Sequence, residues 1–263
     1  MVGNTRDGGY SEKIVVPARN LVAIPDEVAI EHAAVMMCSS ATSLHALNKT
    51  RFRPGERLAI FGLGGLGQSA VQLAFAGERN VFTLSIHESG RWPGTGDVSD
   101  RGGGNARNLP VPPGFNDAEL AHLLARAVLP LGERFAADAV VVTGGADALA
   151  GDPLSRLALG NTALWQAVTA LCLLTPRTLV LGGGGYNPWT LGRCWSGLWG
   201  TLCGDPIPAE LPAPARALLA ALECDLVDED DVDPRWLDTL ADPCVDAPVR
   251  AEVAALARAV MVG

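Results

Sequence analysis

Short apolar runs alternate with longer amphipathic stretches along most of the chain. The apolar runs of strand length are Arg57–Phe61, Val81–Ile86, Ala139–Thr143 and Thr178–Leu181. Apolar residues recur at helical spacing in Gln68–Phe75, Asp117–Leu129 and Thr162–Leu174. Strands and helices in alternation are typical of a parallel sheet covered by helices. The pattern therefore predicts an α/β fold with three layers, in which a mostly parallel sheet carries helices on both faces.

The remaining segments give weaker local signals. Lys13–Ala18 alternates like a strand, Val28–Met36 and Thr42–Leu47 favour short helices, and Arg53–Glu56 is typical of a turn. The Gly- and Pro-rich stretch Ser89–Gly114 has no sustained periodicity. Because a plain linker would not contain WPGTG and GGGN, we interpret this stretch as a long functional loop.

Two signals mark the ends of the helix after this loop. Asn116 and Glu119 have the spacing of a capping box, and Pro130 is expected to end the helix. The tail from Pro206 is predicted to be helical, with the acidic segment Asp225–Asp233 as a solvated surface loop.

Composition narrows the class of protein. The 263 residues are 48% hydrophobic and carry a formal net charge of −9, so no general affinity for nucleic acid or for anionic membranes is expected. No stretch reaches the roughly 18 apolar residues of a membrane span. The six cysteines form no CxxC pair and the first residues have no apolar signal-peptide core, which favours reduced thiols in a cytoplasm. The expected partners are small molecules or proteins.

Two glycine-rich segments each follow a predicted strand and carry one chemically active side chain. AVVVTGGADALAGDP contains Asp147, and TLVLGGGGYN contains Tyr186. Together with VFTLSIHESG, WPGTG, NLPVPPGFND and GRCW, they resemble the zinc-dependent histone deacetylase family, in particular its bacterial acetoin-utilisation branch. The resemblance covers roughly residues 76–263. It implies that the predicted α/β fold contains a truncated deacetylase-like core.

The resemblance implies zinc-assisted hydrolysis of an acetylated lysine, an acetylated polyamine or a small amide. Asp147 matches a zinc-binding aspartate of the family, and Tyr186 matches the tyrosine that stabilises the oxyanion. Trp92 matches an aromatic wall of the substrate channel. Gly184, within the run of four glycines before Tyr186, would allow close backbone approach to the substrate.

Other residues that the family's zinc chemistry needs are missing. A gapless match through Gln72 and Phe75 places the family's metal-binding aspartate and histidine at Gly64 and Leu66, and no two histidines of this chain are adjacent. His87 matches a structural residue at a strand end. Zinc sites need at least three protein ligands, so the sequence predicts an incomplete zinc site and impaired catalysis.

The first part of the chain resembles a different family. GGYSEKIVVPARNLVAIPDEVAIEHAA, CSSATSLHAL and RPGERLAIFGLGGLGQSAVQLA are similar to medium-chain alcohol dehydrogenases over roughly residues 8–75. Gly62, Gly64 and Gly67 form GxGxxG between a predicted strand and helix, the context of a dinucleotide-binding loop, so NAD(P) is the alternative cofactor. Cys38 matches a zinc-ligating cysteine of that family, but its partner ligands are missing and we interpret it as a buried thiol.

The sequence therefore predicts a dehydrogenase-like segment, 1–75, followed by a deacetylase-like segment, 76–263. Three hypotheses stay open: a degraded or complemented deacetylase, a nucleotide-binding module, and a non-catalytic hybrid. A sheet without its upstream strands would leave an apolar edge, which favours self-association.

Two other groups of residues have simpler interpretations. Asp138, Asp147 and Asp152 together resemble an acidic metal cluster, but Asp138 and Asp152 are expected in structural turns. The tryptophans expected in the core, rather than in a nucleic-acid stacking surface, are Trp165, Trp195 and Trp199.

Overall fold

The computed structural model describes residues 13, 15–26, 28, 30, 45, 48–63, 75, 77–91, 94–245 and 247–262. The chain divides into two compact units, residues 1–41 and 42–263. In the first unit, the described residues include the 3₁₀ turn η1 (Ala18–Asn20). The predicted strand Lys13–Ala18 is wrong, because none of its described residues is paired in a strand and Ala18 already belongs to the turn. The predicted helices between residues 28 and 47 lie largely outside the described residues.

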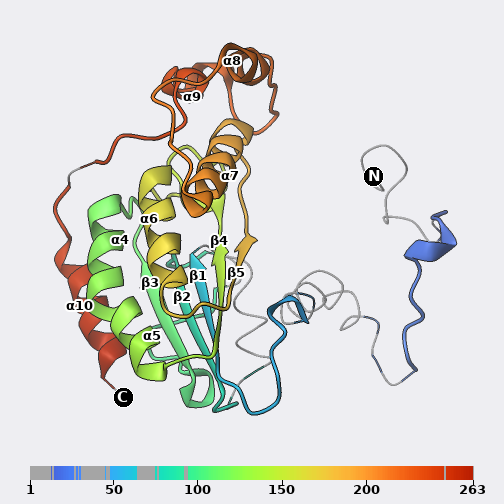
Figure 1. Ribbon diagram of the computed structural model, residues 1–263, viewed down its shortest axis with the longest axis vertical. Helices are drawn as coiled ribbons and strands as arrows, with labels where there is room; N and C mark the ends of the chain where they lie inside the picture. The colour runs from blue at the N-terminus through green and yellow to red at the C-terminus, as the bar shows by residue number, and fades with distance from the viewer. Residues whose placement is uncertain are drawn as a thin grey trace. The chain divides into compact units, whose positions relative to one another are not determined.

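The second unit is built on a five-stranded sheet with the order β3-β2-β1-β4-β5 (Figure 1). Its strands are β1 (Leu58–Leu63), β2 (Val81–Glu88), β3 (Ala106–Val111), β4 (Ala139–Gly144) and β5 (Thr178–Gly182). All four strand pairs are parallel. The predicted α/β class with a parallel sheet is confirmed. Parallel pairing brings the carboxyl ends of the strands to one edge of the sheet, where ligand sites of such sheets form.

Strand β3 corrects the sequence prediction for Ser89–Gly114, which is not loop throughout. The strand pairs with β2 in the register His87 to Pro110 and lies at the edge of the sheet. Proline is tolerated in an edge strand because the missing N–H faces away from the ladder. Pro110 and the polar residues Arg107 and Asn108 obscure the apolar pattern that otherwise marks a strand.

Strand β1 also extends further than predicted. Gly62 was expected in a glycine loop, but it is a strand residue that pairs with Ser85 of β2 and Thr143 of β4. Because β1 is the central strand with a neighbour on each side, the ladder continues through Gly62 to Leu63.

The helices of the second unit are α4 (Asp117–Leu123), α5 (Leu129–Phe135), α6 (Asn161–Cys172), α7 (Pro188–Cys203), α8 (Ala213–Ala220), α9 (Arg235–Asp238) and α10 (Ala251–Met261). Short 3₁₀ turns are η3 (Gly102–Gly104), η5 (Ala146–Ala148) and η6 (Glu229–Asp231). Pro130 does not end its helix as predicted. A π-helical turn, Leu124–Val128, precedes it, and Pro130 then lies in the first turn of α5, where a missing N–H is tolerated.

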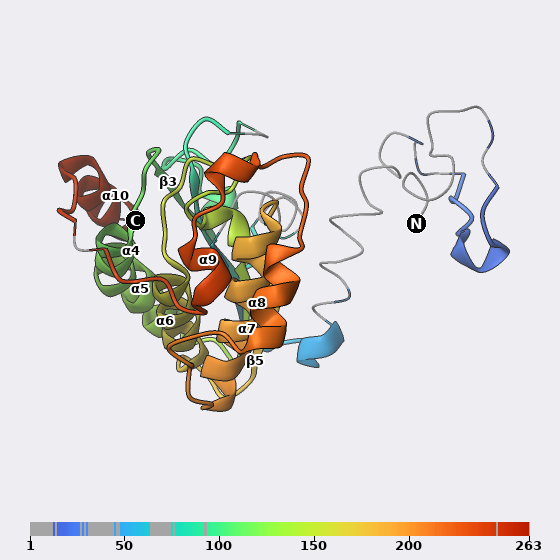
Figure 2. The same cartoon turned by 90° about the horizontal axis from the view of Figure 1, so that it is seen from above.

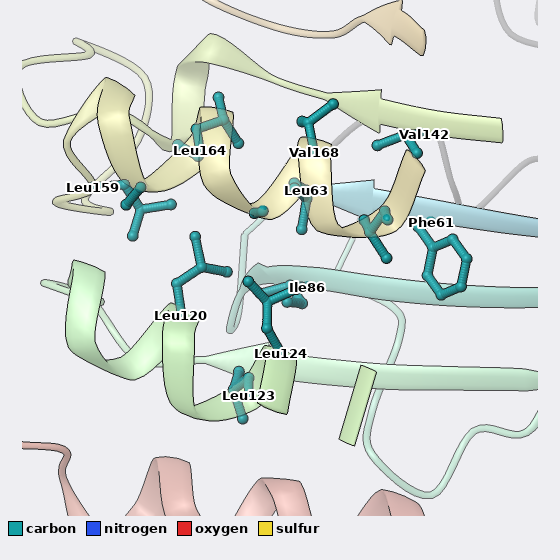
Figure 3. Close-up of a cluster of buried hydrophobic side chains, with 14 of the residues drawn as sticks. Phe61, Leu63, Ile86, Leu120, Leu123, Leu124, Val142, Leu159, Leu164 and Val168 are labelled. Carbon is teal, nitrogen blue, oxygen red and sulfur yellow. The ribbon is translucent and has the colours of Figure 1, made fainter. Parts of the chain in front are cut away.

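Most of the hydrophobic core lies between one face of the sheet and the helices that cover it. Side chains from alternate strand positions, such as Phe61 and Val142, meet leucines of α4 and the residues Leu164 and Val168 of α6 (Figure 3). Figure 2 shows α6 and α7 side by side, and both contribute to this cluster together with α10. A smaller cluster on the opposite face contains Leu58, Ile60, Val81, Ala139 and Val141. The predicted helix Gln68–Phe75, expected in a further layer, lies almost entirely outside the described residues.

The tail after α7 matches its prediction in part. The acidic segment Asp225–Asp233 is mostly exposed and includes η6, as expected of a surface loop. Trp165 is buried and Trp195 half-buried, but Trp199 is 70% exposed, so its assignment to the core is wrong. No helix in the described ranges is long and apolar enough to cross a membrane.

A buried ion pair ties α10 to α4. The capping box is confirmed, with Asn116 and Glu119 exchanging side-chain and backbone hydrogen bonds. The Glu119 carboxylate, 0% exposed, also accepts from Arg250 Nε at 2.6 Å and Nη2 at 2.7 Å. Burial opposes the charge of Glu119, but the hydrogen bonds from Arg250 and Asn116 outweigh it and lower the pKa of Glu119.

We expect Glu119→Gln to destabilise the protein by about 2 kcal/mol, because the variant leaves the guanidinium of Arg250 without its partner. The folded-state pKa of Glu119 is lowered, so its ionised carboxylate contributes to the free energy of unfolding at pH values above the ordinary carboxyl pKa. This contribution is lost as the pH falls below about 4. Urea unfolding of both proteins between pH 3 and 7 measures this difference. A difference that stays constant over that range would contradict the assignment.

Candidate functional site

Asp147 lies in η5, directly after β4. Its side chain is 8% exposed. The turn that carries it is bonded to the ends of two other strands, since Gly145 N–H donates to Leu63 O at 2.7 Å and Ala146 N–H donates to Gly184 O at 2.7 Å. The carboxylate therefore lies where β1, β4 and β5 end.

Glycines enclose the Asp147 carboxylate. A Cβ added to Gly145 or Gly184 would collide with its oxygens. A Cβ added to Gly183 would lie 2.7 Å from Gly145 Cα and 2.9 Å from Gly145 N. These residues are glycine because backbone and carboxylate approach one another too closely for a side chain. The same requirement explains the position of Gly184, which was predicted in the substrate channel: it contacts the carboxylate directly.

Tyr186 follows the glycine run and precedes α7. The residue is half-buried. Burial, and then the negative charges of Asp147 and Asp152, raise the pKa of its phenol above the ordinary value. Tyr186 and Asp147 follow the paired strands β5 and β4, at the same edge of the sheet. At neutral pH the phenol is protonated and can donate a hydrogen bond.

His87 has a structural role, as the sequence indicated. Its Nδ1 lies 2.9 Å from Ser85 Oγ, and its Nε2 lies 3.1 Å from Gly96 O. Because a carbonyl only accepts, Nε2 carries the proton, and Nδ1 accepts from the serine hydroxyl. Burial lowers the pKa of His87. The imidazole holds the loop at Gly96, whose φ of 86° and closeness to the ring leave no room for a Cβ.

The remaining predicted site residues are not all described. Trp92, Gly64 and Gly67 lie outside the described residues, as does Cys38. Gly62 is a paired residue of the central strand. Of the three aspartates near β4, Asp138 accepts from Arg57 N at 2.8 Å, so its predicted structural role is confirmed.

The described residues do not make up a metal centre. Among them no group of three or more His, Cys, Asp or Glu side chains is placed to hold a metal ion. Five cysteines of the described part are free thiols: Cys172, Cys194, Cys203, Cys224 and Cys244. Asp147 offers one carboxylate, and a zinc ion needs at least two further protein ligands. The part of the chain that the structure describes therefore does not fit a complete zinc site.

A model of the histone deacetylase domain matches residues 69–202, just over half of the chain. The chain belongs to the histone deacetylase family. It is 35% identical to histone deacetylase 8 of Danio rerio over 148 residues, which are 54% of this chain and 39% of that protein. Among solved structures, a histone deacetylase homologue from Aquifex aeolicus superimposes with a TM-score of 0.74 at 30% identity. That match covers 84% of this chain and 61% of the other.

The chain thus spans less than half of the curated deacetylase that it matches. It is also 43% identical to an alcohol dehydrogenase of Geobacillus stearothermophilus over 84 residues, which are 32% of this chain and 25% of that protein. Each of these two similarities covers a minor part of the relative concerned.

Proposed function

We propose that this chain is a histone deacetylase-family amide hydrolase whose catalysis is impaired. One observation carries the proposal: Asp147 and Tyr186 follow the ends of the paired strands β4 and β5, while no group of three or more His, Cys, Asp or Glu side chains among the described residues is placed to hold a metal ion. The gapless match would account for this deficit, because it sets glycine and leucine, Gly64 and Leu66, at the family's ligand positions. Neither side chain has an atom that binds zinc.

In this proposal Tyr186 and the glycines around Asp147 form the part of the site that receives an acyl group. The neutral phenol of Tyr186 would donate a hydrogen bond to the oxygen of the substrate carbonyl as negative charge develops on it. Gly183 and Gly184 would keep the backbone before Tyr186 packed against Gly145 and Asp147. Asp147 would be the remaining metal ligand. An acetylated lysine, an acetylated polyamine or a small acetylated amide is the class of substrate that this arrangement supports.

The dehydrogenase similarity supports an alternative cofactor. The 84-residue match to an alcohol dehydrogenase favours a segment of different origin joined to the deacetylase segment near residues 72–77. In this alternative Gly62, Gly64 and Gly67 would bind the pyrophosphate of a nicotinamide dinucleotide. Gly62 lies in β1, where the strand leads into the segment that contains the other two glycines.

Zinc content tests the main proposal. We expect purified protein, after exposure to excess zinc and gel filtration, to retain far less than one zinc per chain, and Asp147→Ala to leave that content unchanged. Elemental analysis measures both. Hydrolysis of acetyl-lysine by the same samples, with Tyr186→Phe as the control, is expected to stay at the background level. One zinc per chain that disappears in Asp147→Ala would show a complete metal centre and overturn the proposed impairment.

A further inference from the structure

We propose that Asp152 is a positioning residue for Tyr186. The inference rests on the proposed function, because it assigns to Asp152 the task of fixing the oxyanion tyrosine relative to Asp147. The sequence indicated only a turn role for Asp152. The structure adds a second contact, across the site, that a turn role does not require.

The Asp152 carboxylate accepts one backbone hydrogen bond on each oxygen. Oδ1 accepts from Leu154 N at 2.9 Å, which closes the turn after residue 151. Oδ2 accepts from Tyr186 N at 2.7 Å, which joins that turn to the residue after the glycine run. Asp152 is 6% exposed, so water does not readily replace either bond.

This pair of donors explains why an aspartate occupies the position. Two N–H groups point at two different oxygens, and only an ionised carboxylate offers an acceptor to both. An asparagine would present its NH₂ group to one of the two donors. A serine or alanine would leave at least one buried N–H without an acceptor.

A second hydrogen bond holds the next residue to the same turn. Asn187 Nδ2 donates to Gly151 O at 2.9 Å, while Asn187 Oδ1 accepts from Trp189 N and Thr190 N at the start of α7. Asn187 is fully buried. Tyr186 is therefore hydrogen-bonded to Asp152, and Asn187, which caps α7, is hydrogen-bonded to Gly151.

The turn itself is held from outside by α9. Gly151 has a φ of 86°, and a Cβ there would lie 2.5 Å from the ring of Trp236. Trp236 is 9% exposed. The indole thus packs against the turn to which Tyr186 and Asn187 are hydrogen-bonded. These contacts restrict the turn and hold the backbone from which the Tyr186 side chain extends, and positioned donors of this kind cost no reorganisation during reaction.

Amide hydrogen exchange resolved at single residues tests the inference, since each oxygen of Asp152 protects a different amide. In the unaltered full-length chain we expect slow exchange at both Tyr186 and Leu154. In Asp152→Ala we expect exchange to accelerate roughly tenfold or more at both residues, because both amides lose their acceptor. Amides of β4, such as Val141, are expected to keep their rates and report that the fold is intact. Ser155→Ala is the matched control, since the Ser155 hydroxyl binds Leu157 N in the same loop.

Acceleration at Leu154 alone would show that Asp152 serves only its own turn and would overturn the inference. Fast exchange at Tyr186 in the unaltered chain would overturn it as well, whether or not the alanine variant folds. The exchange rates do not depend on catalysis. The inference about Asp152 can therefore be wrong while the proposed function is right, and the proposed function can be wrong while the inference is right. Should hydrolysis be measurable, Asp152→Ala is expected to lower kcat per folded molecule and leave KM nearly unchanged. The rate is divided by the folded fraction, because a loss of folded protein alone also lowers the apparent kcat.

Discussion

A chain that carries Gly64→Asp and Leu66→His is expected to hold about one zinc ion, where the unaltered chain holds far less. The two substitutions place a carboxylate and an imidazole at the positions that match the family's ligands. Leu63, immediately before them, already accepts a hydrogen bond from Gly145, two residues from Asp147. In the gapless match these two side chains would join the Asp147 carboxylate, and three protein ligands with an open fourth position are the composition of a catalytic zinc site.

Zinc affinity is expected to rise at least a thousandfold, measured by competition with a chelating dye. Asp147→Ala in the double variant is the control and is expected to abolish most of the gain. An equal gain without Asp147 would mean that the new ligands bind zinc elsewhere and would contradict the proposed geometry. The same double variant distinguishes zinc binding from NAD(H) binding, because an aspartate in place of Gly64 would repel the pyrophosphate of the dinucleotide. If the unaltered chain binds NAD(H) saturably, that binding should disappear.

Strands could be predicted from the sequence where they form continuous apolar runs. The runs at Ala139 and Thr178 are buried or half-buried strands as expected, and their parallel pairing followed from the helix between them. Strand β3 was missed because edge strands accept residues such as Pro110 that central strands reject. Pro130 was wrongly predicted to end a helix. A π-helical turn precedes it, and the helical structure continues past the proline into α5.

The sequence predicted the individual residues of the candidate site but not the contacts between segments that are distant in sequence. Asp147 and Tyr186 each follow a strand of one parallel sheet, and the carboxyl ends of adjacent strands lie together, so their proximity could be expected. The second contact of Asp152 could not, because it joins residues 34 positions apart and has no pattern in the sequence. The packing of Trp236 on Gly151 is equally invisible, since it depends on where α9 folds back.

Gly183→Ala is expected to destabilise the protein by about 3 kcal/mol, although alanine adds one methyl group. The new Cβ would lie 2.7 Å from Gly145 Cα and 2.9 Å from Gly145 N. Backbone atoms cannot move aside as a flexible side chain can, so the ends of β4 and β5 must separate. Because Asp147 lies two residues beyond Gly145, separation also moves its charge away from Tyr186. The pKa of the phenol should then fall toward its ordinary value.

Gly192→Ala supplies the matched control for this variant. Gly192 lies exposed inside α7 with no atom within 4 Å of an added Cβ, so the same substitution there should stabilise the protein by about 1 kcal/mol. Urea unfolding measures both free energies. Absorbance at 295 nm, in a Tyr10→Phe background that leaves Tyr186 as the sole tyrosine, follows the phenol. If Gly183→Ala were as stable as Gly192→Ala and titrated like the parent, close approach of the strand ends would not be what holds Asp147 and Tyr186 together.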